Sequence, residues 1–151
     1  MKRFVEHSDF TIERTIKATP DKVFQAFADP ETKKKWFHGP DDWRQEKSTH
    51  DFRVGGHETS EGGPKGGWTS KFRSMYIDIV PNERIIYSYD MDLDDKHISA
   101  SLAVIEFKPE GSDSTKLVLT EHGAYLDGFD GADGRKQGTE DLLDQLSALF
   151  K

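Results

Sequence analysis

Hydrophobic and polar residues alternate near the start of the chain, from Asp9 to Ala18. Phe10, Ile12 and Ile16 fall on one side of this segment, and mostly polar residues fall on the other. Alternation of this kind is typical of a strand with one buried face, so we predict a strand here. Arg14 is the exception, because it is a charged residue on the apolar side.

The next segment has a helical pattern. Thr19 is a favourable N-cap and Pro20 suits the first helical position. An apolar stripe follows at Val23, Phe24, Ala26 and Phe27. Asp29-Pro30 repeats the signal of a cap followed by proline, so we predict a second short helix that leads to Trp36-Phe37.

Beyond Pro40 the helical period disappears and strand-like runs follow one another. The predicted strands are Trp43 to Ser48, Phe52 to Thr59, Trp68 to Val80, Arg84 to Met91, Ile98 to Lys108 and Lys116 to Glu121. Short turn segments separate them. Consecutive strands with short links favour an antiparallel meander over a parallel nucleotide-binding sheet.

The chain closes with an amphipathic pattern that predicts a helix with one stripe facing the core. The stripe consists of Leu142, Leu143, Leu146, Leu149 and Phe150. The predicted plan is therefore strand, two helices, six strands and a final helix, in a single domain of 151 residues.

Composition and charge narrow the function classes. The net charge of −7 argues against a nucleic-acid partner or an anionic membrane surface. The one basic run, Lys33 to Lys35, is interpreted as a solvated helix face. No cysteine is present, which excludes disulfides and thiolate chemistry. No signal-peptide or membrane-spanning run occurs, so we expect a soluble cytoplasmic protein.

The segment Arg53 to Trp68 holds six of the thirteen glycines. A phosphate-binding loop needs G-x-x-x-x-G-K-[ST] or G-x-G-x-x-G between a strand and a helix, and neither pattern occurs. We predict a bend or bulge at Gly55-Gly56 and a hairpin tip around Gly62-Gly63 and Gly66-Gly67.

Two further segments are similar to known metal-binding motifs but lack the ligand spacing that those motifs require. His57-Glu58 begins like the zinc-protease motif H-E-x-x-H, but Glu61 stands where the second histidine belongs. The aspartates of Asp127 to Gly134 fall three apart, whereas an EF-hand loop needs acidic ligands at alternate positions. We therefore predict no metal, no cofactor and no catalytic constellation.

Five segments, in order and spread over nearly the whole chain, carry a family resemblance. They are Ile12 to Phe37, Asp51 to Gly56, Asp78 to Ser88, Val104 to Gly123 and Gly138 to Leu146. The chain resembles the SRPBCC superfamily (START-like, helix-grip fold), and within it the AHSA1-like branch, which is named after a domain of the activator of Hsp90 ATPase. It departs from the family at Gly138-Thr139, where the family often has Gly-Trp.

The resemblance implies an α+β helix-grip fold, a curved antiparallel sheet of about seven strands around a long C-terminal helix. Between sheet and helix it implies a cavity that commonly takes an apolar small molecule. Alternation places Trp68, Phe72 and Tyr76 on one face of their strand, and Tyr87 and Tyr89 on one face of theirs. The predicted ligand contacts are Arg14, Trp36, Trp68, Phe72, Tyr76, Asp78, Tyr87, Tyr89 and Leu142.

Three functions stay open at this point. The first is a module that binds an apolar small molecule. The second is an enzyme of cyclase or hydrolase type that uses the same cavity, with Arg14, Asp78 and Glu106 as candidate acid or base. The third is a stress- or chaperone-related protein interaction, with chaperone binding or a homodimer formed through a sheet edge or the first helices. Hsp90 binding is not expected, because the chain lacks the additional N-terminal domain of the eukaryotic co-chaperone.

Overall fold

The computed structural model describes residues 2–151, which form a seven-stranded antiparallel sheet and three helices. The strands are β1 (Val5–Ile16), β2 (Arg44–His50), β3 (His57–Gly63), β4 (Ser70–Val80), β5 (Arg84–Leu93), β6 (Lys96–Glu110) and β7 (Ser114–Leu126). The helices are α1 (Pro20–Ala28), α2 (Pro30–Lys33) and α3 (Ala132–Ala148). The predicted order of elements is confirmed.

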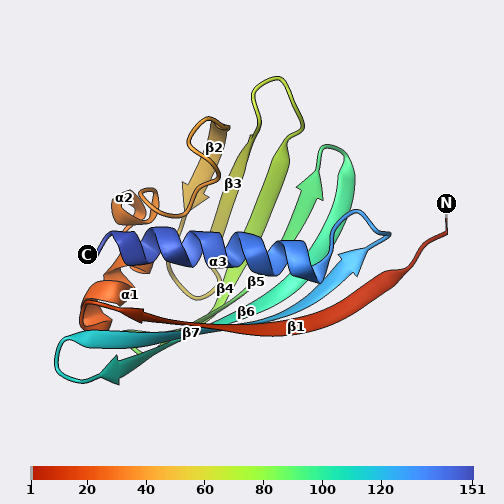
Figure 1. Cartoon of the computed structure of the whole chain (residues 1–151). Coiled ribbons are helices and arrows are strands. Elements are labelled where there is room, and N and C mark those ends of the chain that lie inside the picture. Colours follow the sequence, from red (N-terminus) through yellow and green to blue (C-terminus); the bar gives the residue numbers. More distant parts are fainter. Residues whose placement is uncertain (1) are drawn as a thin grey trace.

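The sheet has the strand order β1-β7-β6-β5-β4-β3-β2. Strands β2 to β7 therefore form a meander, and β1 pairs with β7 as an edge strand. Figure 1 shows the sheet curving around α3, with α1 and α2 at the end where the chain finishes. This is the helix-grip α+β fold that the family resemblance implied.

Local sequence signals explain the first two helices. Thr19 is the N-cap residue of α1 and Pro20 is its first residue. Asp29 caps α2, because its carboxylate accepts hydrogen bonds from the backbone N–H and the hydroxyl of Thr32. Trp36, just after α2, donates its indole N–H to the carbonyl of Ala26 at 2.8 Å, which fixes the two helices against each other.

The main core lies between the sheet, α1 and α3. Leu143 and Leu146 of α3 are completely buried in it, as the amphipathic pattern predicted. Leu142 and Phe150 are half-buried against the same core. The prediction is wrong for Leu149, which is 37% exposed, because α3 ends at Ala148 and the chain turns there.

The glycine-rich segment shapes two turns. The predicted hairpin is confirmed, because β3 and β4 are antiparallel neighbours joined through residues 64–69. The predicted strand Phe52 to Thr59 begins too early, since β3 starts at His57. Gly55 has a φ of +82°, which favours glycine, and its N–H donates to the carbonyl of Tyr76. This turn therefore docks on β4 before β3 begins.

Candidate functional site

A cavity of about 780 Å³ lies between the concave face of the sheet and α3. Its walls come from α2, from the segment that leads into β2, from strands β2 to β7 and from α3. Aromatic rings form much of the inner wall: Phe37 packs edge-on against Phe72 at 5.4 Å between centroids, and Phe72 lies 5.0 Å from Tyr89. The volume falls within the range of about 300–1,000 Å³ that is usual for small-molecule pockets.

The concave face also carries polar rows that the strand register creates. One row of directly paired residues crosses six strands and consists of Gly123, Ser101, Tyr89, Ser74, Glu58 and His50. The next row contains Glu121, Ala103, Tyr87 and Tyr76. Because directly opposite residues lie on the same face of a sheet, these rows bring two glutamates into one cavity.

Glu58 forms the centre of a buried cluster with Lys33 and Tyr76, called here the Glu58 cluster. The ammonium of Lys33 lies 2.6 Å from Oε1 of Glu58, and the hydroxyl of Tyr76 donates to the same oxygen. Burial lowers the pKa of Lys33, and the carboxylate of Glu58 opposes this effect. Burial also raises the pKa of Tyr76. Buried charges of this kind need their partners to be tolerated.

A second buried cluster, the Glu121 cluster, lies towards α3. The hydroxyl of Tyr89 donates to Oε2 of Glu121 at 2.7 Å, and Arg135 donates to that hydroxyl at 2.9 Å. Arg135 also donates to Ser99 at 2.9 Å and forms an ion pair with Asp130. Burial raises the pKa of Glu121, although the hydrogen bond from Tyr89 and the charge of Arg135 act in the opposite direction.

Tyr87 lies in the inner face between the two clusters. Burial raises its pKa well above the usual value, and the hydroxyl of Tyr89 and the carboxyls of Glu121 and Glu58 add to the rise. Within residues 2–151 no hydrogen bond engages the Tyr87 hydroxyl. The cavity therefore contains a free hydroxyl between two buried acids.

His50 closes the Glu58 end of the cavity. Its two ring nitrogens are buried and make no hydrogen bond in the described part of the chain, and Nε2 lies 3.4 Å from Oε1 of Glu58. Burial lowers the pKa of His50, with the nearby carboxylate acting against it. His50 thus adds a neutral ring to this wall at neutral pH.

Five of the predicted ligand contacts line the cavity: Trp36, Phe72, Tyr87, Tyr89 and Leu142. Tyr76 lies beneath the lining as part of the Glu58 cluster. The structure brings these six together from β4, β5, α3 and the segment after α2. Their role as ligand contacts stays a prediction.

The remaining three predicted contacts lie elsewhere. Arg14 pairs with Glu140 and Asp144 of α3, at 3.6 and 3.0 Å, and so ties β1 to the helix. Trp68 packs on the ring of Trp43 at 5.0 Å and is 38% exposed. Asp78 forms an ion pair with Arg84 at 2.5 Å and does not line the cavity.

Sequence reasoning predicted Tyr76 and Tyr89 as ligand contacts but missed the acids and bases of both clusters, which are Lys33, Glu58, Glu121 and Arg135. Lys33 was interpreted as solvated, but it is buried, whereas Lys34 and Lys35 are exposed. The available signal was the helical spacing of Lys33 to Trp36, since residues three apart share a helix face. Glu121 follows buried Leu117 and Leu119 at two-residue intervals along β7, and this alternation predicts that its side chain faces the interior.

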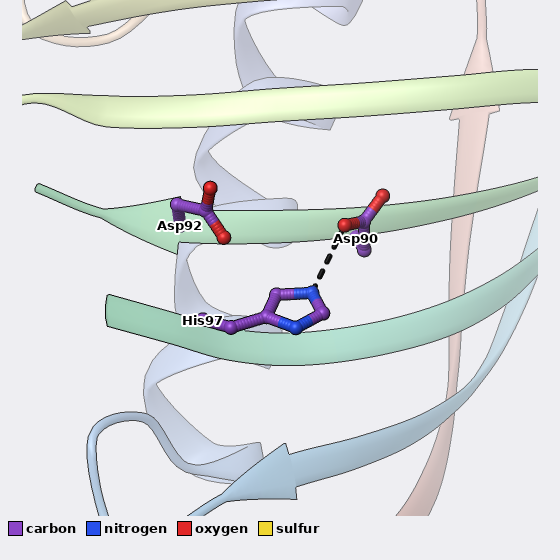
Figure 2. Close-up of side chains that lie close together, drawn as sticks. All are labelled: Asp90, Asp92 and His97. Atoms are coloured by element: carbon purple, nitrogen blue, oxygen red, sulfur yellow. Dashed lines mark hydrogen bonds and ion pairs between the residues drawn. The ribbon is translucent and has the colours of Figure 1, made fainter. Parts of the chain in front are cut away.

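A third polar cluster lies on the outer face of the sheet. Figure 2 shows Asp90 and Asp92 on β5 beside His97 on β6, with His97 bonded to Asp90 at 2.9 Å. The ligand atoms of the three lie within 4.8 Å of one another. Arg73 forms ion pairs with both carboxylates, at 2.6 Å from Asp90 and 2.9 Å from Asp92. The group is a saturated ion-pair cluster, which we call the Arg73 cluster.

The fold and the site together define a helix-grip protein with a cavity between sheet and helix, a fold of the ligand-binding type. Residues 17–151 match the model of the family described as "Activator of Hsp90 ATPase homolog 1-like protein", and the chain belongs to this family. Among the described residues, 2–151, no helix has the length and apolar character needed to cross a membrane.

Several solved structures are similar to this protein over almost the whole chain. The Mll3558 protein from Rhizobium loti is 45% identical, with a TM-score of 0.89 over 96% of this chain and 98% of its own. A putative uncharacterized protein from Rhizobium leguminosarum is 40% identical, with a TM-score of 0.93 over 99% and 98%. An AHSA1-like protein from Aeromonas hydrophila, 20% identical over 93% and 90% with a TM-score of 0.68, shares the fold. No curated protein matches the chain.

Proposed function

We propose that this protein binds a small, largely apolar molecule in the cavity between the sheet and α3. The observation that carries the proposal is the cavity itself, with a volume of about 780 Å³ and a wall of aromatic rings from β4, β5 and the segment after α2. An apolar guest there would remove ring surface from water, which contributes roughly 25 cal/mol for each Å² buried.

A calorimetric titration with 2-methylnaphthalene, an uncharged ring compound, tests this proposal. The wild type is compared with Leu142→Trp, which adds bulk to the cavity wall, and with Ile77→Trp, which adds the same ring on the exposed outer side of β4. We expect binding to the wild type and to Ile77→Trp, and loss of binding in Leu142→Trp. Equal binding by both variants, or no binding to the wild type, would contradict the proposal.

A second candidate function is acid–base catalysis on a molecule held in the same cavity. The observation that favours it is Glu121, a buried carboxyl whose pKa is raised and which lines the cavity. Arg14, Asp78 and Glu106 lie outside the cavity and do not support this candidate. Chemical conversion of a bound molecule by the wild type and not by Glu121→Gln would separate catalysis from binding.

A further inference from the structure

The hydrogen-bond donors of the two cavity clusters are already used within the protein. The ammonium of Lys33 donates to Glu58 and lies 3.4 Å from the hydroxyl of Tyr76. The guanidinium of Arg135 donates to Tyr89, Ser99 and Asp130. Both cations are therefore neutralised by an adjacent carboxylate and hydrogen-bonded in more than one direction.

The acceptors of the same clusters are not all used. Within residues 2–151, the hydrogen bonds to Glu121 end on Oε2, and those to Glu58 end on Oε1. The second oxygen of each carboxyl, and the hydroxyl of Tyr87 between them, have no protein partner there. Glu121 is only 2% exposed and Glu58 only 5%. None of these three oxygens belongs to the fully enclosed polar atoms that lack a partner, so each is accessible from the cavity, where it can accept a hydrogen bond from a guest.

We propose that the natural guest is an uncharged molecule with an apolar ring system and a hydroxyl group, and that this hydroxyl donates to Glu121 next to Tyr87. The inference deepens the proposed function and rests on it. Tyr89, packed against Phe72 and beside Tyr87, forms the apolar wall for the rings. An anionic guest is disfavoured, because Lys33 and Arg135 already have anionic partners and the free oxygens belong to acids.

Three probes with the same ring system separate these contributions at neutral pH. 2-Naphthol offers a donor, 2-methoxynaphthalene offers only an acceptor, and 2-methylnaphthalene offers neither. We expect 2-naphthol to bind on the order of ten-fold more tightly than either of the other two, as the net contribution of a single hydrogen bond predicts. 2-Naphthoate, the anionic analogue, is expected to bind more weakly than 2-naphthol.

The probe results distinguish a wrong hydroxyl specificity from a wrong proposed function. If 2-methylnaphthalene binds but 2-naphthol gains nothing over it, the cavity binds apolar rings and the inferred hydroxyl specificity is wrong. If 2-methoxynaphthalene or 2-naphthoate binds as tightly as 2-naphthol, the cavity supplies a donor or a positive charge, and the inference is overturned. If no probe binds, the proposed function fails first.

Matched variants locate the hydroxyl contact. Glu121→Gln and Tyr87→Phe keep the shape of each side chain, and we expect each to remove most of the ten-fold preference while 2-methylnaphthalene binding changes by less than about two-fold. The controls are Glu13→Gln, an exposed acid on β1, and Tyr125→Phe, whose buried hydroxyl does not line the cavity. An unchanged preference in both cavity variants, or an equal loss for both probes, would overturn the assignment.

Discussion

The concave and outer faces of the sheet hold their carboxyl groups in different environments. On the concave face, Tyr76 and Tyr89 bond to the carboxyls of Glu58 and Glu121, which are buried. On the outer face, Arg73 bonds to Asp90 and Asp92, whose side chains are 34% and 22% exposed. Carboxyl groups occur on both faces, and the two faces differ in the access of these carboxyls to water.

The difference in access to water changes the direction in which the pKa of each carboxyl is shifted. At the Arg73 cluster the hydrogen bond from Arg73 is the main cause that lowers the pKa of Asp92, so charge is stabilised there. At the Glu121 cluster burial is the main cause and raises the pKa of Glu121. Polar groups that face water are satisfied by one another and by solvent, whereas those in the cavity are left with unused acceptors. The concave face is therefore where recognition of a guest is expected.

The largest effect on the free energy of unfolding is expected when a buried ion pair is broken. Glu58→Ala leaves the ammonium of Lys33 buried beside Tyr76 without its anion, and we expect a loss of about 3–5 kcal/mol in the free energy of unfolding. Asp90→Ala, on the outer face, is the matched change and should cost less than about 1 kcal/mol. Urea denaturation of both variants beside the wild type gives the two values. Similar losses would mean that burial does not distinguish the two faces.

The next effect concerns α3, which keeps water from the concave face. Leu146 is completely buried against the core, so Leu146→Ala should destabilise the protein by about 2–5 kcal/mol. Leu149→Ala changes a partly exposed residue beyond the helix and is expected to cost less than about 1 kcal/mol. Thermal and urea unfolding would measure both. An unchanged melting temperature for Leu146→Ala would show that α3 does not dock as described.

A smaller effect is the pH dependence due to Glu121. Burial raises its pKa above the ordinary value of 4.5, so the folded protein holds a proton that the unfolded chain has already released. The unfolded state then binds fewer protons, and the contribution of Glu121 to stability falls as pH rises from about 4.5 through the raised pKa. Glu121→Gln should remove this decline. Parallel curves of unfolding free energy against pH for the two proteins would contradict the assignment.

The smallest effect is expected on the outer face. Arg73→Ala should cost less than about 1 kcal/mol at low salt, and the difference from wild type should shrink at 1 M salt, where the Debye length is about 3 Å. The loss in Glu58→Ala should persist at high salt, because that pair is buried. A salt-sensitive Glu58→Ala and a salt-insensitive Arg73→Ala would reverse the comparison.

Most of the fold could be predicted from local patterns. Alternation in β1, the proline signals before α1 and α2, and the spacing of Leu143 and Leu146 depend on neighbouring residues, which a sequence displays directly. Errors occurred at boundaries, such as the start of β3 at His57, where a long-range hydrogen bond between the Gly55 turn and Tyr76 decides the conformation.

The site was only partly predictable, because strand register is not visible in the sequence. Alternation identified Tyr87 and Tyr89 as neighbours on one face, and both line the cavity. Glu58 and Glu121 are 63 positions apart in sequence, since 121 − 58 = 63, and only the pairing through β4, β5 and β6 brings them to one face. The spacing of Lys33 and Trp36 indicates that both side chains face the core, but the partner of Lys33 there, Glu58, is known only from the structure.

The most direct test of the central claim is an NMR titration of the isotopically labelled protein with 2-naphthol. Backbone amide shifts report which part of the molecule meets the probe. We predict saturable changes concentrated in the cavity-lining parts of β5, β7 and α3, near Tyr87, Glu121 and Leu142, with the amides around His97 on the outer face unmoved. Changes confined to the outer face, or no saturable change at all, would contradict the claim that the concave face is the binding site.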